Sequence, residues 1–185
     1  YTLHALKNNF MCAIFGFIST TNKYDKAHLT KMSDILKHRG PDGSGFYVSK
    51  VSPTSDVGEI FLGHNRLSII DLSEKGKQPM SNEDGSIWLT YNGEIYNFQE
   101  LKKELLDKGH KFKSNTDSEV IIHAYEEYGI NCLERFNGMF AFALFDKRKN
   151  QLILARDRIG IKPLYYLKND DLFAFSSEVK GFRAL

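Results

Sequence analysis

The order of apolar segments along the chain restricts the fold more than any other feature of the sequence. Short runs rich in aromatic and β-branched residues are typical of strands, and they occur both before and after a set of helical segments. This order favours an α+β fold in which two sheets pack together with helices outside them. The expected strands are residues 12–18, 45–50, 59–70, 86–93, 139–146, 151–157 and 172–178.

Some segments have the apolar spacing of amphipathic helices. The expected helices are residues 25–40, 97–109 and 116–129. Gly40 and Gly109 are stop signals for the first two helices. Asn97 is the expected N-cap of the second helix, and Thr116 and Glu119 have the spacing of a capping box at the third.

Composition and charge narrow the classes of function. The chain has 185 residues, with 25 Lys and Arg against 23 Asp and Glu. We therefore expect one domain and, since like charges form no block, no nucleic-acid partner. No apolar run is long enough for a membrane span, and the first residues lack a secretory pattern. Cys12 and Cys132 are the only cysteines, and no Cys/His group has metal-ligand spacing. These features predict a cytoplasmic protein without a metal site.

Cys12 allows two interpretations. A cysteine in an apolar strand is most often a small buried hydrophobe. A catalytic thiol, with an ordinary pKa of about 8.5, would need a base, and no histidine is obviously paired with Cys12. An N-terminal α-amine, with a pKa of about 7.7–8.0, is a suitable base beside its own side chain. Met11 precedes Cys12, so translation beginning at Met11 and loss of that methionine would produce such an amine.

Three polar positions also carry alternatives. Asn92 and Gly93 form an Asn-Gly dipeptide, which is common in turns but could also supply an oxyanion hole through the amide and a backbone N–H. Arg66 could simply emerge at a strand end, or it could bind a substrate carboxylate. Asp117 could stabilise a helix N-terminus, or it could receive a substrate ammonium. Together, Arg66 and Asp117 would suit the head group of an amino acid.

Taken in order, several segments resemble one enzyme family. They are "MCAIFGF", "HRGPDGSG", "HNRLSIID", "YNGEIYN", "TDSE", "GMFAFALFD", "ARDRIGIKPLYY" and "SSEVKG". Their order and spacing are similar to those of the glutaminase domain of glutamine-hydrolysing asparagine synthetases. These are class II glutamine amidotransferases with the N-terminal-nucleophile hydrolase fold. The resemblance runs from Met11 to the end of the chain, and it implies a four-layer αββα sandwich with two antiparallel sheets.

The resemblance also implies residue roles. Cys12 matches the nucleophile, Asn92 and Gly93 the oxyanion hole, Arg66 the residue that binds the glutamine α-carboxylate, and Asp117 the residue that binds its α-amine. Further pocket positions match Leu67, Ser68, Ile69, Ile70 and Glu94. The implied reaction hydrolyses glutamine to glutamate and ammonia through a cysteinyl thioester. No cofactor is implied in this chain, because ATP and magnesium belong to a C-terminal synthetase domain that the chain lacks.

The boundaries of the domain follow from the same comparison. Residues 1–11 are expected to be a mis-called start or a propeptide with the initiator methionine, and residues 12–185 the glutaminase domain. The last residues, "SSEVKGFRAL", have the pattern of a new helix, so we expect more protein downstream. The expected partners are glutamine and the synthetase domain, and a homodimer is left open. Two alternatives remain: an amidotransferase with another acceptor, such as a sugar or cell-surface polymer, or a non-catalytic glutamine-binding module if the extension is retained.

Overall fold

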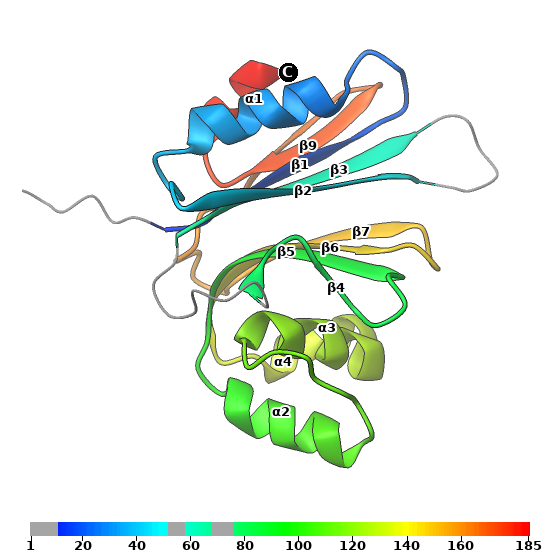
Figure 1. Cartoon of the computed structure of the whole chain (residues 1–185), viewed down its shortest axis with the longest axis vertical. Coiled ribbons are helices and arrows are strands. Elements are labelled where there is room, and N and C mark those ends of the chain that lie inside the picture. Colours follow the sequence, from blue (N-terminus) through cyan, green and yellow to red (C-terminus); the bar gives the residue numbers. More distant parts are fainter. Residues whose placement is uncertain (1–10, 52–57, 68–75) are drawn as a thin grey trace, which may run out of the picture.

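Two antiparallel sheets face each other in the computed structural model, which describes residues 11–51, 58–67 and 76–185 (Figure 1). The first sheet has the strand order β2-β3-β1-β9-β8, and the second has the order β4-β5-β6-β7. The strands are β1 (Ala13–Ser19), β2 (Gly43–Lys50), β3 (Glu59–Arg66), β4 (Met80–Ser81), β5 (Ile87–Ile95), β6 (Gly138–Asp146), β7 (Gln151–Arg156), β8 (Tyr165–Lys168) and β9 (Leu172–Ser176).

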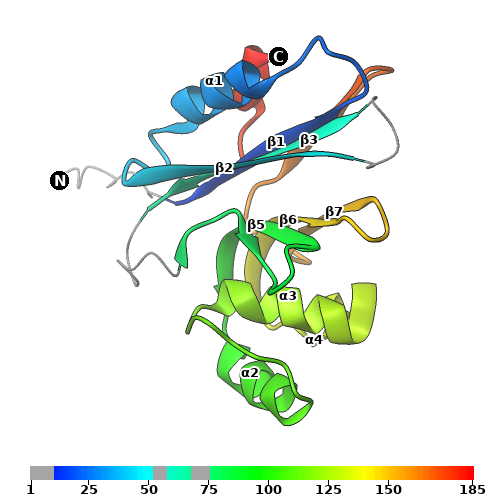
Figure 2. The same cartoon turned by 45° about the vertical axis from the view of Figure 1, so that its right-hand side comes forward.

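Helices cover the outer face of each sheet (Figures 1 and 2). They are α1 (Lys26–Leu36), α2 (Phe98–Asp107), α3 (Asp117–Tyr128), α4 (Cys132–Arg135) and the 3-10 helices η2 (Gly129–Asn131) and η3 (Val179–Ala184). The first sheet is covered by α1 and η3, and the second by α3 and α4, with α2 packed against α3 on its far side from the sheet. The four-layer αββα architecture implied by the resemblance is therefore confirmed. No helix in the described part of the chain is both long and apolar enough to cross a membrane.

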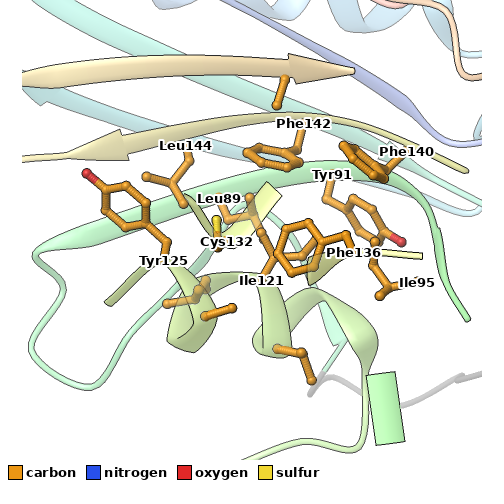
Figure 3. Close-up of a cluster of buried hydrophobic side chains, with 14 of the residues drawn as sticks. Leu89, Tyr91, Ile95, Ile121, Tyr125, Cys132, Phe136, Phe140, Phe142 and Leu144 are labelled. Carbon is orange, nitrogen blue, oxygen red and sulfur yellow. The ribbon is translucent and has the colours of Figure 1, made fainter. Parts of the chain in front are cut away.

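Three apolar layers hold these elements together. One lies between α1 and the first sheet and includes Phe15, Phe17 and Met32. A second fills the space between the sheets around Phe145 and Phe175. The largest lies between the second sheet and its helices, where β5, β6, α3 and α4 contribute side chains (Figure 3). Each sheet therefore buries both faces, which places Cys12 and the polar end of β5 beside a rigid core.

The strands follow the sequence pattern closely, with one informative difference. Strand β5 continues through Asn92 and Gly93 to Ile95, pairing along its whole length with β6. The Asn-Gly dipeptide is thus part of a central strand, and the turn interpretation is wrong. Local turn preference is overridden because nine consecutive residues of β5 pair with β6. Strand β3 ends at Arg66, and the expected residues 68–70 lie outside the described residues.

Asn97 and Thr116 occupy the expected N-cap positions of α2 and α3, but neither side chain makes a capping hydrogen bond. Asn97 makes no capping hydrogen bond; its side chain donates to Arg135 O and accepts from Asn137 N, both at 3.0 Å. Thr116 makes no capping hydrogen bond at α3, and Glu119 accepts from the backbone N–H groups of residues 113 and 114. The first helix ends at Leu36, before the expected Gly40. The side chains of Asn97 and Glu119 bond to groups outside their own helices instead of to the first turn.

Candidate active site

Cys12 lies immediately before β1 and beside the end of β3. Because Ala13 pairs with Asn65 across the β1–β3 ladder, Cys12 is brought next to Leu67, 55 residues away in sequence. The thiol accepts a hydrogen bond from Leu67 N at 3.5 Å, and Sγ lies 3.9 Å from Leu67 O. Its side chain is neither fully buried nor exposed. The thiol is thus held in place by backbone groups but remains partly accessible.

Arg39, which follows α1, holds the backbone of Cys12. Its guanidinium donates from Nε and Nη2 to Cys12 O, each at 3.3 Å, and from Nη1 to Glu178 Oε1 at 3.0 Å. The segment around it, "HRGPDGSG", is part of the family resemblance, yet sequence reasoning assigned Arg39 no role. Its contacts come from α1, β1 and the end of β9, so no local pattern could have revealed them.

Some features of the surroundings of Cys12 favour ionisation of its thiol, and others oppose it. Burial raises the pKa of the Cys12 thiol, whereas the Leu67 N–H and the charges of Arg66 and Arg39 lower it. Burial has the larger effect, so the pKa is raised overall and the resting group is a thiol. No imidazole within the described residues hydrogen-bonds to Cys12. If a base removes the proton from Sγ, that base is therefore not a histidine of the described residues.

Asn92 presents an unused hydrogen-bond donor. It is buried in β5, and its side-chain Nδ2 has no hydrogen-bond partner among the described residues. Thr90, two positions earlier on the same face of the strand, donates from Oγ1 to Gly63 O at 3.0 Å in the facing sheet. The Asn92 side chain therefore points toward the first sheet, the sheet that carries Cys12. A buried, unpaired amide donor is rare and is expected where a ligand supplies the acceptor.

Gly93 is required by the packing of β5 against β6. A Cβ atom on Gly93 would lie 2.3 Å from Met139 O and 2.7 Å from the Cα of Phe140. No side chain fits there without moving backbone. The glycine is thus explained by strand packing, whether or not its N–H also contacts a ligand.

Asp117 is the first residue of α3, and two groups of β5 hold its carboxylate. Asp117 Oδ2 accepts a hydrogen bond from the Tyr91 hydroxyl at 2.6 Å and one from Ile95 N at 2.9 Å. Burial, together with the neighbouring Asp117 charge, raises the pKa of Tyr91 well above its ordinary value, so its hydroxyl stays protonated and donates. Tyr91 N in turn donates to Gln78 Oε1 at 2.6 Å. Tyr91 and Gln78 are site neighbours that sequence reasoning missed.

The fold brings Arg66 and Leu67 to the start of β1, where Cys12 lies. Arg66 and Leu67 adjoin Cys12 because β3 ends beside it. A charge on Cys12 also raises the pKa of Tyr91. Glu94 is exposed at the end of β5, and its charge acts on Tyr91 and Lys162. Three expected pocket residues, Ser68, Ile69 and Ile70, lie outside the described residues.

One group of possible metal ligands lies far from Cys12 in sequence. Ligand atoms of His110, His123 and Glu126 lie within 4.8 Å of one another. His123 Nδ1 is 2.8 Å from Glu126 Oε2. Burial lowers the pKa of His123, but hydrogen bonds to Glu119 and Glu126 outweigh it and raise the pKa to about 9. A proton therefore already occupies this position, and the group is best described as an ion-pair network.

Comparison with known proteins identifies clear relatives. Residues 11–185 match the family described as "Glutamine amidotransferase domain". Asparagine synthetase [glutamine-hydrolyzing] 2 of Bacillus subtilis is 44% identical over 175 residues, covering 92% of this chain and 22% of the relative. Asparagine synthetase [glutamine-hydrolyzing] 1 of Arabidopsis thaliana is 42% identical over 174 residues, covering 92% of this chain and 28% of the relative. The chain spans about a third or less of the length of such relatives.

A solved structure shares the fold. Glutamine phosphoribosylpyrophosphate amidotransferase from B. subtilis, solved with ADP and GMP, superposes with a TM-score of 0.75 at 24% sequence identity. The match covers 94% of this chain and 43% of the other. At this identity the match establishes the arrangement of sheets and helices.

Proposed function

This chain belongs to the glutamine amidotransferase domain family, and from that premise we propose that it hydrolyses the side-chain amide of glutamine at Cys12. Two observations carry the proposal: a thiol held by Leu67, and an unused amide donor on Asn92 that points toward the sheet that carries the thiol. A nucleophile and an electrophilic donor are the two parts that acyl transfer requires.

The proposed reaction begins with proton transfer from the Cys12 thiol to the α-amine of the same residue. The sulfur then forms a bond to the side-chain amide carbon of glutamine, and the carbonyl electron pair moves onto the oxygen. Asn92 Nδ2 and the backbone N–H of Gly93 stabilise that oxyanion. Collapse of the intermediate breaks the C–N bond, and the leaving nitrogen takes the proton from the α-ammonium as ammonia. Water then hydrolyses the thioester, which releases glutamate and restores the thiol.

Arg66 and Asp117 select free glutamine in this proposal. The guanidinium of Arg66 binds the α-carboxylate, and the carboxylate of Asp117 binds the α-ammonium. Both Tyr91 and Ile95 N donate to Oδ2 of Asp117, so Oδ1 is the oxygen that we assign to the substrate. Leu67, Ser68, Ile69, Ile70 and Glu94 complete the proposed glutamine pocket.

The active form in this proposal begins at Cys12. With Met11 attached, the nitrogen of Cys12 is an amide and cannot accept a proton. Removal of Met11 before a small residue such as cysteine supplies the free α-amine, and its ordinary pKa of about 7.7–8.0 suits a base near neutral pH.

The ammonia acceptor is inferred from the longer relatives. Because several of them are named asparagine synthetases, we propose that the ammonia serves ATP-dependent asparagine formation from aspartate in a longer protein. ATP and magnesium would be bound by a synthetase portion, outside this chain.

The experiment measures glutamate release from glutamine by protein that begins at Cys12, as verified by intact mass. We expect turnover in this form, none in Cys12→Ala, and near-normal turnover in Cys132→Ala. Cys132 is the matched control because it is buried in the apolar layer between the second sheet and its helices, and burial raises its pKa to about 12. Turnover by folded Cys12→Ala would refute the nucleophile assignment. Glutamine-dependent asparagine formation by the full-length protein tests the acceptor.

A further inference from the structure

Lys162 lies on the connection between β7 and β8, and its backbone is held on both sides. Asp157 Oδ2 accepts from Lys162 N at 2.9 Å, and Asp157 Oδ1 accepts from Ile161 N at 2.7 Å. Arg156 Nε donates to Lys162 O at 2.7 Å. These contacts fix the direction in which the side chain leaves the loop.

The ammonium of Lys162 is buried at the residue that precedes Cys12. Lys162 is only 7% exposed, and its Nζ lies 3.2 Å from Met11 Sδ. In the described part of the chain, no carboxylate forms an ion pair with this ammonium, and a thioether cannot balance its charge. Nearly buried lysines are rare unless they are paired. Arg39, a second cation near Cys12, is paired with Glu178 at 3.0 Å.

We propose that Lys162 is a positioning residue for the proposed glutaminase reaction: its ammonium keeps the α-amine of Cys12 in the neutral form that accepts the thiol proton. The inference rests on the proposed function, since it concerns the base of that reaction. It adds a residue that contacts neither the glutamine nor Sγ in the proposed mechanism.

The physical reason is repulsion between like charges. Protonation of the α-amine would place a second cation beside Lys162, in a site where burial already disfavours charge. The charge of Lys162 therefore favours the unprotonated amine. For a partly buried pair of like charges, it lowers the pKa of the α-amine by about one unit. Burial, followed by the charge of Arg39, lowers the pKa of Lys162 itself, whereas Cys12, Glu94 and Asp157 raise it.

Other titratable and charged groups act on Cys12 or Lys162, and they have to stay the same in the variants that are compared. The charged ones are Arg39 after α1, Arg66 at the end of β3, Glu94 on β5, Asp157 after β7 and Glu178 after β9, and the neutral, titratable Tyr91 also lies on β5. All of these residues are kept in a Lys162 variant, so the Lys162 ammonium is the only charge removed.

The experiment compares Lys162→Met with Lys162→Arg in protein that begins at Cys12. For Lys162→Met we expect the acidic limb of the kcat/KM profile to move up by about one pH unit, which is about a tenfold loss on that limb. The alkaline plateau and the KM for glutamine should change little. Lys162→Arg keeps the cation and should retain the wild-type limb. Lys168→Met, on the exposed strand β8, is the matched control and should leave the profile unchanged.

The alkylation rate of Cys12 by iodoacetamide, measured against pH in a Cys132→Ala background, tests the same charge without turnover. We expect its profile to move to higher pH in Lys162→Met. An equal loss of rate at every pH, or an unmoved limb in both assays, would overturn the proposal. If Lys162→Met does not fold, Lys162→Gln takes its place in both assays. A wild-type protein that begins at Cys12 but releases no glutamate would instead refute the proposed function, while alkylation would still test Lys162.

Discussion

The hydroxyl of Tyr91 donates a 2.6 Å hydrogen bond to Oδ2 of Asp117, which joins the central strand β5 to the first turn of α3. Tyr91 directly precedes Asn92 in the strand, so consecutive side chains point to opposite faces of the sheet. One face presents the unused amide of Asn92, and the other holds the carboxylate of Asp117. A single strand thereby sets the spacing between the proposed oxyanion donor and the proposed ammonium acceptor.

Tyr91→Phe tests this relationship directly. Without the hydroxyl, Asp117 keeps only the Ile95 N–H and is less well oriented, so we expect the KM for glutamine to rise about tenfold with little change in kcat. Steady-state glutamate release measures both constants. Tyr47→Phe is the control, because the buried Tyr47 hydroxyl has no partner among the described residues. A fall in kcat with KM unchanged would contradict the positioning role.

Asn92→Ala should act on the chemical step. Removing one oxyanion donor typically lowers kcat by about 10²–10³-fold, and binding of ground-state glutamine should change far less. The contrast is Asn82→Ala. The side chain of Asn82 already bonds to Glu126 and to the backbone of residues 86 and 87, so its loss should reduce stability and leave kcat near normal. Comparable kcat values in Asn92→Ala and wild type would remove Asn92 from the proposed oxyanion hole.

Gly93→Ala should destabilise the fold. Its methyl group would approach the carbonyl oxygen of Met139 at 2.3 Å, and relieving that overlap should cost about 1–3 kcal/mol of unfolding free energy. Denaturant unfolding at equilibrium measures this cost. Gly43→Ala, also in a strand, has no atom within 4 Å of its Cβ position and should be tolerated. Equal stabilities of the two variants would contradict the packing argument.

The pH dependence of stability should reveal the ion pairs of α3. The His123 pKa is about 9 against an ordinary 6.5, so its contribution is full below pH 6.5 and is lost as pH rises through 9. Burial raises the Glu119 pKa, but hydrogen bonds from His123 and the loop before α3 bring it to about 2 against an ordinary 4.5. Its contribution is full above pH 4.5 and is lost as pH falls through 2.

Because the pKa of His123 is raised and that of Glu119 is lowered, both groups stabilise the fold fully between pH 4.5 and 6.5. Denaturant unfolding of wild type and His123→Gln across the alkaline range measures the His123 part. We expect the wild type to lose roughly 1–3 kcal/mol there and the variant to show a flatter profile. Parallel profiles would show that His123 is not ionised in the folded protein. His28→Gln is the control, because the His28 side chain forms part of the exposed capping box of α1.

The alternation and length of the apolar runs were enough to predict most of the strands and the α+β class. The alternation of apolar and polar side chains along a strand depends only on neighbouring residues, so it can be recognised in the sequence. The caps were predicted less well. Asn97 and Glu119 have capping residue types, yet their partners lie outside their own helices: Asn137 for Asn97, and the loop before α3 for Glu119.

The sequence by itself determined the chemical groups of the site, because a thiol, an amide and a carboxylate bring their reactivity with them wherever they fold. Only the tertiary structure decided which of them meet. Arg39 and Lys162 reach the start of β1 from 27 and about 150 residues away, through sheet pairing and loop contacts. The tertiary structure also placed Asn92 and Gly93 in a strand, because pairing with β6 outweighs a local preference for a turn. Proximity and burial arise from contacts between distant segments, and they set the charge and orientation of each group.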